Sequence, residues 1–298
     1  MQRWPFSRWC LAWLLSSLLG LLSFSAIANA NTLVIRYPRP ESADDKRADY
    51  PLKLLALSLQ QPNRNVVLQP SPHPMPQSRA LRQLANQQID VMWTMTNRER
   101  EQQFLPVRIP IYKGLIGWRI ALIKTERQAE FSAMQDLAQL KALQLGQGHD
   151  WPDTAILMHH GFQVTSATNY HSLFKMLHAG RIDFFPRSIV EIWGELDNQR
   201  HMNLAVEQSF ALVYPTAFYF FVNKQNVALA KMIEQGLEQA IRDGRFEHLF
   251  WQYQRPWITK AQLEQRRIFR LNNPELPEAT PLQRAELWFQ APATSAHD

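Results

Sequence analysis

The sequence contains very little cysteine and very little glycine. Its 298 residues include one cysteine, Cys10, and ten glycines. A single cysteine excludes a disulfide framework within the chain, and His149, Asp150 and Asp153 are too thin a cluster to be a convincing set of zinc ligands. The glycines match neither a phosphate-binding loop nor a dinucleotide fingerprint, and no serine lies in a Gly-x-Ser-x-Gly elbow. We therefore expect no cofactor, no metal and no serine-hydrolase chemistry.

A concentrated basic patch is also missing. The chain has 32 Lys and Arg against 26 Asp and Glu, which gives a formal net charge of +6, and its basic residues are scattered. Proteins that bind nucleic acid usually gather their basic residues on one face or along one helix. We expect no nucleic-acid partner.

Only the N-terminus holds a long apolar run. Arg3 and Arg8 precede an apolar run of about 15 residues that starts at Cys10, and Ala28-Asn29-Ala30 follows it. This arrangement is typical of a secretory signal, and the run is shorter than the ~20 residues that span a bilayer. Cleavage after Ala30 leaves 268 residues and lowers the net charge to +4, because it removes two arginines and no acid. We expect a periplasmic mature chain without thiols.

The first half of that chain alternates strand and helix patterns. Thr32–Tyr37, Asn65–Leu68 and Ile89–Trp93 are short, apolar and rich in β-branched residues, as strands are. The proline-rich stretch Pro70–Pro76 is expected to be a loop, and Ser78 to cap the helix that follows it. The order strand, helix, strand, helix, strand predicts a parallel sheet with helices on both faces.

The second half repeats this order. Three further strands are expected at Ala142–Leu145, Gln163–Thr165 and Ile182–Phe185. The spacing of Leu84-x4-Ile89-Asp90 recurs as Leu177-x4-Ile182-Asp183, at the junction of a helix and a strand in both places. The repeat indicates two lobes of similar construction.

Two apolar segments, Gly114–Ile123 and Ala211–Val222, flank the second repeat. The chain is therefore expected to leave the first lobe, build the second and return, so that paired crossovers form a hinge beside a cleft. The boundaries that follow are a signal peptide at 1–30, the first lobe at 31–119, the second lobe at 120–213, the returning part of the first lobe at 214–261, and an extension at 262–298 that packs on the first lobe and frays at its end.

These segments resemble the periplasmic solute-binding proteins of the polar amino acid transport type, the family-3 extracellular solute-binding domain. The resemblance covers about residues 31–257 and is carried by Leu33–Tyr37, Leu84–Trp93, Thr96–Pro110 and Gly180–Asp183. It implies an α/β fold of the type II periplasmic-binding-protein kind, with two lobes joined by two crossover strands. It also implies a monomeric, non-enzymatic receptor that closes on a small polar solute and delivers it to an ABC-type importer.

The resemblance implies that an arginine after the third strand binds the ligand's carboxylate. Arg100 fits best when counted back from Pro110, and Arg98 remains the alternative. A guanidinium offers a planar fork of donors that matches a carboxylate. Where the family often has an acid for the ligand's amino group, this chain has Arg187, with Glu191 one helical turn later. Two cleft arginines favour an anionic, carboxylate-bearing solute.

Further candidates come from the rule that ligands of open α/β sheets lie beyond the carboxyl ends of strands. The rule nominates Tyr37 and Trp93 in the first lobe, and Trp151 and Thr154 in the loop that leads into a helix of the second lobe. Tyr214 lies in the returning crossover and is expected to face the cleft.

Two other functions fit the same pattern. The domain could report ligand binding to a membrane signalling protein, in which case only the partner differs from that of a transport receptor. It could also be a dehydratase-like periplasmic enzyme, which would need a general acid in the cleft; Glu191 or Asp153 could serve.

Overall fold

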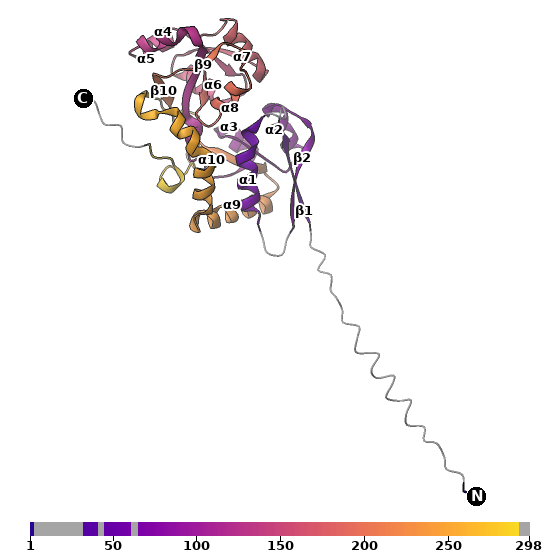
Figure 1. Cartoon of the computed structure of the whole chain (residues 1–298). Helices are drawn as coiled ribbons and strands as arrows, with labels where there is room; N and C mark the ends of the chain where they lie inside the picture. The colour runs from indigo at the N-terminus through magenta and orange to yellow at the C-terminus, as the bar shows by residue number, and fades with distance from the viewer. Residues whose placement is uncertain (3–31, 41–44, 61–64, 292–298) are drawn as a thin grey trace.

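Two lobes organise the chain in a computed structural model that describes residues 1–2, 32–40, 45–60 and 65–291 (Figure 1). The predicted signal segment, with its cleavage site after Ala30, and the predicted frayed end after residue 291 lie outside the described residues. Figure 1 shows α1, α2, α9 and α10 around one lobe and α4 to α8 around the other. The predicted α/β class with two lobes is confirmed.

Two small sheets form the first lobe. Strand β1 (Leu33–Arg39) pairs in parallel with β2 (Val66–Pro74), while β11 (Phe218–Asn223) lies between β3 (Val91–Met95) and β4 (Phe104–Val107) and is antiparallel to both. The amide of Asp90 donates to the carbonyl of Arg36 at 2.8 Å, which links the two sheets. The helices of this lobe are α1 (Asp49–Ser58), α2 (Gln77–Ala85), α3 (Arg98–Gln103), α9 (Val227–Arg242) and α10 (Arg245–Ala261).

One seven-stranded sheet forms the second lobe, in the order β12-β10-β5-β8-β6-β7 with β9 also paired to β5. The strands are β5 (Trp118–Lys124), β6 (Gln144–Gly148), β7 (Gln163–Ala167), β8 (Phe184–Ser188), β9 (Leu204–Val206), β10 (Phe210–Val213) and β12 (Arg267–Arg270). The helices are α4 (Gln128–Ala133), α5 (Leu137–Lys141), α6 (Pro152–His159), α7 (Tyr170–His178) and α8 (Ile192–Asp197). Strands β6, β7 and β8 are parallel, as expected for the repeated strand-helix order.

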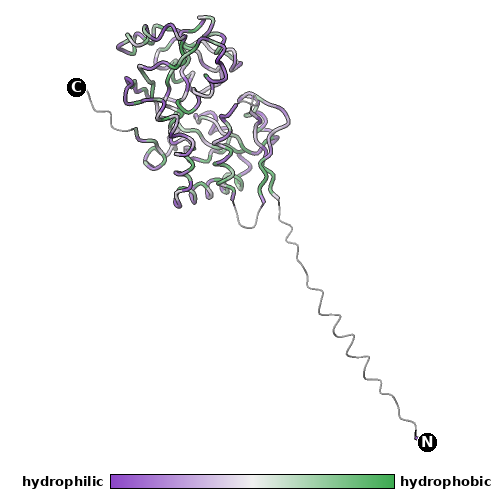
Figure 2. The backbone as a smooth tube through the Cα atoms, in the orientation of Figure 1, coloured by the Kyte–Doolittle hydropathy of each residue, from purple (hydrophilic) through white to green (hydrophobic). Residues whose placement is uncertain are grey.

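The apolar core is continuous from one lobe to the other. One cluster of buried side chains includes Leu54 and Phe220 in the first lobe, Leu115 in a crossover, and Leu173 and Phe185 in the second lobe. Figure 2 shows hydrophobic stretches on the strands and mixed or hydrophilic ones on the surrounding helices. None of the described helices is both long and apolar enough to cross a membrane.

The two crossovers run side by side where the lobes meet. The amide of Tyr214 donates to the carbonyl of Gly117 at 3.2 Å. A Cβ on Gly117 would lie 2.1 Å from the carbonyl oxygen of Tyr214, so only glycine allows the backbones to approach this closely.

Two local predictions are wrong at strand ends. The expected loop Pro70–Pro76 is β-strand as far as Pro74, because β2 pairs only with β1 and proline is tolerated on an edge strand. The next helix begins at Gln77 with Pro76 at its N-cap, so Ser78 is not the cap. Strands β3, β6 and β8 also extend two or three residues further than expected, which moves the start of each following loop.

The prediction that residues 262–298 pack on the first lobe is wrong for the start of this segment. Strand β12 joins the sheet of the second lobe in parallel with β10, because its four residues continue the edge that β10 leaves open. The chain then returns to the first lobe, where Arg284 pairs with Glu238 of α9 at 2.5 Å. The amide of Phe289 donates to the carbonyl of Lys113 at 2.7 Å, so the segment also contacts the crossover.

Two helical glycines give opposite predictions. A Cβ on Gly236 in α9 would lie 1.7 Å from the carbonyl oxygen of Ser58, whereas a Cβ on Gly194 in α8 would meet nothing within 4 Å. We expect Gly236→Ala to reduce the free energy of unfolding by about 1–3 kcal/mol through overpacking. Gly194→Ala should raise it by up to about 1 kcal/mol through helix propensity. Urea denaturation checks both, and equal midpoints for the two variants would contradict the close packing of α9 on α1.

Candidate ligand-binding cleft

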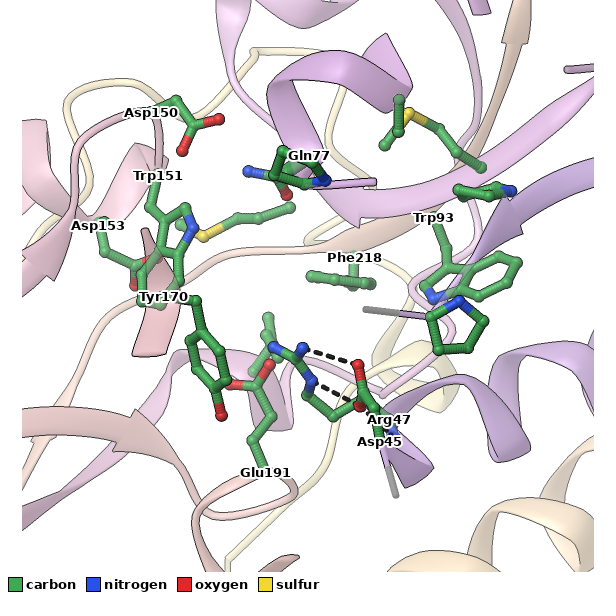
Figure 3. A pocket seen from close by; sticks show the side chains of 18 of the residues that line it. Asp45, Arg47, Gln77, Trp93, Asp150, Trp151, Asp153, Tyr170, Glu191 and Phe218 are labelled. Carbon is green, nitrogen blue, oxygen red and sulfur yellow. Dashed lines mark hydrogen bonds and ion pairs between the residues drawn. The ribbon is translucent and has the colours of Figure 1, made fainter. Parts of the chain in front are cut away.

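A cavity of about 320 Å³ lies between the lobes (Figure 3). Its first-lobe side comes from the ends of β1 and β3, the start of α2 and the segment that enters α1. Its second-lobe side comes from the ends of β6 and β8 and the starts of α6 and α7. The carboxyl ends of parallel strands thus face the cavity, as ligand sites in open α/β sheets do.

Aromatic and thioether side chains form much of the wall. The first lobe contributes Met75, Met92, Trp93, Met95, Tyr112 and Phe218, and the second lobe contributes Trp151 and Tyr170. Figure 3 shows Trp151 and Tyr170 on one side of the space, with Trp93 on the other and Phe218 between them. Small-molecule sites commonly combine such apolar walls with a few polar groups.

Charges of both signs line the same cavity in equal number among the described residues. The cations are Arg39, Arg47, Arg119 and Arg187, and the anions are Asp45, Asp150, Asp153 and Glu191. The site therefore has no excess of positive charge.

Arg187 forms a buried ion pair at the base of the cleft. Its Nε and Nη2 donate to the two carboxylate oxygens of Glu195 at 2.7 and 2.6 Å, and both side chains are 3% exposed. Its guanidinium stacks 4.5 Å from the centre of the Trp151 ring, and Nη2 is 3.1 Å from Glu191. Burial tends to raise the pKa of Glu195, but the charge and hydrogen bonds of Arg187 outweigh it and leave the pKa lowered.

This lowered pKa predicts a stability that falls in acid. The unfolded state takes up a proton on Glu195 at a higher pH than the folded state does, so the pair stabilises the fold above the ordinary pKa and is lost as the pH falls below it. We expect Glu195→Gln to be less stable than the wild type by about 2 kcal/mol at pH 7, with the difference shrinking by pH 3. Urea unfolding at both pH values measures it. A difference that stays constant with pH would show that the carboxylate charge is not responsible.

A second buried ion pair involves Arg119 of the neighbouring strand β5. Arg119 Nη2 is 2.6 Å from Asp153, and the hydroxyl of Tyr214 donates to the same carboxylate. Glu191 lies between the two arginines, 3.6 Å from Arg119 Nη1 and 3.1 Å from Arg187 Nη2. Its buried Oε2 nevertheless has no hydrogen-bond donor among the described residues. This oxygen of Glu191 is therefore in ionic contact with two arginines but accepts a hydrogen bond from neither.

Arg100 is buried but does not line the cavity. Its Nη1 donates to the hydroxyl of Thr94 at 2.8 Å and to the carbonyl of Met95 at 2.6 Å. Its Nη2 donates at 2.9 Å to the carbonyl of Asp150, which belongs to the second lobe. Burial lowers the pKa of Arg100 to about 10, so the side chain is charged at neutral pH. Arg100 thus connects the lobes through one hydrogen bond to the second lobe, while two others hold it in the first.

The other sequence-derived candidates divide into two groups. Arg187, Glu191, Trp93 and Trp151 line the cavity, whereas Arg98, Tyr37, Thr154 and Tyr214 do not. Arg98 is exposed at the first position of α3, and Tyr37 packs behind Trp93 with ring centres 6.0 Å apart. The hydroxyl of Thr154 donates to the carbonyl of Gly148 at 2.7 Å, which fixes the turn into α6.

Sequence reasoning missed the polar segment between β1 and α1. Asp45 and Arg47 lie in this segment, and Figure 3 shows their ion pair within the cavity. The charge-rich stretch follows directly on the first strand, so the strand-end rule could have nominated it. It was missed because the rule was applied only to the first residues after each strand.

Comparison with known proteins identifies the fold. No protein-family model matches the chain, and no curated protein matches it in sequence. Solved structures do match: the periplasmic binding protein of Salmonella typhimurium described for high arginine specificity has 16% identity and a TM-score of 0.56, with 75% of this chain and 99% of that chain covered. The chain has the periplasmic-binding-protein fold.

Two further solved neighbours have the same fold but different described roles. An ancestral arginine-binding protein bound to glutamine has 17% identity and a TM-score of 0.54, and the match covers 75% of this chain and 97% of that chain. A histidine kinase sensor domain with similarity to periplasmic binding proteins has 14% identity and a TM-score of 0.55, over 74% and 95%. At such identities the likeness establishes the fold, and the function has to be argued from the cleft.

Proposed function

We propose that this protein is an exported, non-enzymatic receptor that captures a small amino-acid-like solute between its lobes and presents it to an ABC-type importer in the inner membrane. The observation that carries the proposal is the cavity itself, which takes its lining from both lobes and combines aromatic walls with paired charges. Its volume of about 320 Å³ is at the lower end of the range for small-molecule sites. The solved neighbours that bind arginine or glutamine support the same class of ligand.

The charge balance changes the kind of ligand that we expect. The sequence favoured an anionic solute because two arginines were expected in the cleft. Arg187 is neutralised by Glu195 and Glu191, and Arg119 by Asp153. A ligand that carries both a carboxylate and an ammonium group therefore matches the cavity better than a bare anion, because burying an unpaired charge is costly. Glu191 is the proposed acceptor for the ammonium group.

Thermal-shift screening tests this proposal. The twenty standard L-amino acids, a set of dicarboxylates and a set of phosphorylated metabolites are added at 1 mM, taken as about 1,000 times a micromolar Kd, where mass action stabilises the fold by about 4 kcal/mol. We expect an amino acid to give the largest rise in melting temperature, and Glu191→Gln to reduce that rise. A rise with dicarboxylates alone would restore the anionic ligand, and no rise with any compound would contradict a receptor for such solutes.

A sensory role is the second candidate, since one solved neighbour is the sensor domain of a histidine kinase. Both roles use the same binding chemistry, so the partner decides between them. Chemical cross-linking in intact cells, with and without the ligand found by screening, should capture a transporter subunit for the first role. Capture of a membrane kinase in its place would favour the second.

A further inference from the structure

The four arginines that line the cavity differ in how far their guanidinium groups are already occupied. Arg187 gives two hydrogen bonds to Glu195 and contacts Glu191, while Arg119 contacts both Asp153 and Glu191. Both arginine side chains are 3% exposed. A ligand carboxylate at either one would face the acids that already surround it, and like charges in a buried site repel.

Arg39 is held away from the middle of the cavity. Its Nε donates to the carbonyl of Ser71 at 2.7 Å, and its amide donates to the hydroxyl of the same serine at 3.0 Å. These bonds tie the side chain to the edge strand β2, and the residue is exposed to solvent.

Arg47 presents one open edge to the cavity. Its Nε and Nη2 donate to Asp45 at 2.8 and 2.7 Å, whereas the nearest carboxylate to Nη1 is Glu195 at 3.9 Å, beyond hydrogen-bonding distance. The guanidinium lies 4.5 Å above the centre of the Tyr170 ring, which fixes its plane. In Figure 3 the group lies between Tyr170 and Asp45, beneath Phe218. Nη1 therefore donates no hydrogen bond to the described residues and has the Glu195 carboxylate at 3.9 Å as its nearest anionic neighbour.

We propose that Arg47 supplies the carboxylate subsite of the ligand through its Nη1 edge, and that Arg100 is a positioning residue that holds the lobes together. The inference rests on the proposed function and deepens it, since it names the group that recognises the ligand's acid end. It also reassigns the role that the family resemblance gave to Arg100. Three of the five N–H donors of Arg100 bond to two first-lobe acceptors and one second-lobe carbonyl, and Arg100 does not line the cavity, so it is not placed to meet a ligand there.

The two arginines make separate contributions to affinity. Arg47 distinguishes a ligand with a carboxylate from one with an amide, because a guanidinium forms a stronger hydrogen bond with a charged carboxylate than with a neutral amide oxygen. Arg100 favours the closed arrangement of the lobes for either ligand. A ratio of affinities for an acid and its amide therefore reports on Arg47 alone.

Isothermal titration with the twenty standard L-amino acids and their α-carboxamides tests the assignment in the full mature chain. For the wild type we expect the best-bound acid to bind at least about 10-fold more tightly than its amide, the loss of one charged hydrogen bond being about 10- to 100-fold. In Arg47→Ala the ratio should fall to within about 3-fold, while Arg100→Ala weakens acid and amide alike and keeps the ratio. Arg98→Ala is the matched control, because it removes the same charge from an exposed position outside the cavity and should leave the ratio unchanged.

The outcomes separate the two proposals. If the wild type binds acids well and the ratio collapses in Arg100→Ala but persists in Arg47→Ala, the assignment is overturned and the receptor function stands. If the wild type binds none of the amino acids, the proposed function fails and the subsite with it. Circular dichroism of each variant confirms that the fold is retained, and Arg47→Lys, which keeps the charge but loses the fork, should restore only part of the ratio.

Discussion

Arg187→Ala should be among the most destabilising single substitutions at the cleft, with a loss of about 3–5 kcal/mol in the free energy of unfolding. The substitution takes the nearest cation from Glu195, which is 3% exposed, and from Glu191, and leaves only Arg47 at 3.9 Å and Arg119 at 3.6 Å beside them. It also removes the guanidinium that stacks on Trp151. Desolvated carboxylates without a partner are the reason for the expected size of the effect. Chemical denaturation in urea, monitored by tryptophan fluorescence, measures it.

Arg200→Ala is the control for that prediction. Arg200 pairs with Asp197 at 3.1 Å, but the two side chains are 79% and 57% exposed. Exposed pairs contribute between zero and about 1 kcal/mol, so this variant should unfold at nearly the wild-type urea concentration. If both arginine variants lose the same small amount, the Arg187 ion pair is not the stabilising element of the cleft base that we take it to be.

Arg266→Ala should have the second largest effect, a loss of about 3 kcal/mol in the free energy of unfolding, because it removes buried hydrogen bonds at the start of the C-terminal segment. Arg266 is 6% exposed and precedes β12. Its Nε donates to the carbonyl of Ala261 at 2.6 Å, and its Nη1 donates to the carbonyls of Glu207 at 2.5 Å and Phe210 at 3.2 Å. Without the guanidinium these buried acceptors lose their donor, and β12 keeps only its backbone pairing with β10.

Hydrogen–deuterium exchange locates this second effect as well as measuring it. In Arg266→Ala the amides of β10 and β12 should exchange faster than in the wild type, while those of β3 and β11 in the first lobe should not change. Arg270→Ala, at the exposed end of the same strand, should leave exchange and stability within about 0.5 kcal/mol of the wild type. Unchanged exchange in β12 of Arg266→Ala would mean that the strand is held by other contacts.

The order of strands and helices was predictable because apolar periodicity and capping residues are local signals. Asn169 and Asn226 are such capping residues, since each precedes a helix and accepts a hydrogen bond from the amide three residues later. The edge position of β2 is a tertiary property, so its prolines suggested a loop. The pairing of β12 with β10 was not predictable either, because four residues carry too weak a pattern to show which sheet they join.

The position of the cleft between the lobes was predictable from the sequence, but only some of its lining residues were. Arg187, Glu191, Trp93 and Trp151 were nominated, and all four line the cavity. Spacing could not show that Arg100 turns its guanidinium toward Thr94 and the second lobe, since that depends on how the lobes meet. Nor could spacing show that Glu195 neutralises Arg187. This ion pair depends on how α8, which carries Glu195, packs against β8, which carries Arg187.

A crystal structure of the mature chain with its best-bound amino acid tests the central claim most directly. We expect the ligand in the cavity between the lobes, with its carboxylate at Arg47 and its ammonium group at Glu191, while Arg187 keeps its pair with Glu195. A ligand bound outside this cavity, or a cavity that stays empty at saturating amino acid, would contradict the account.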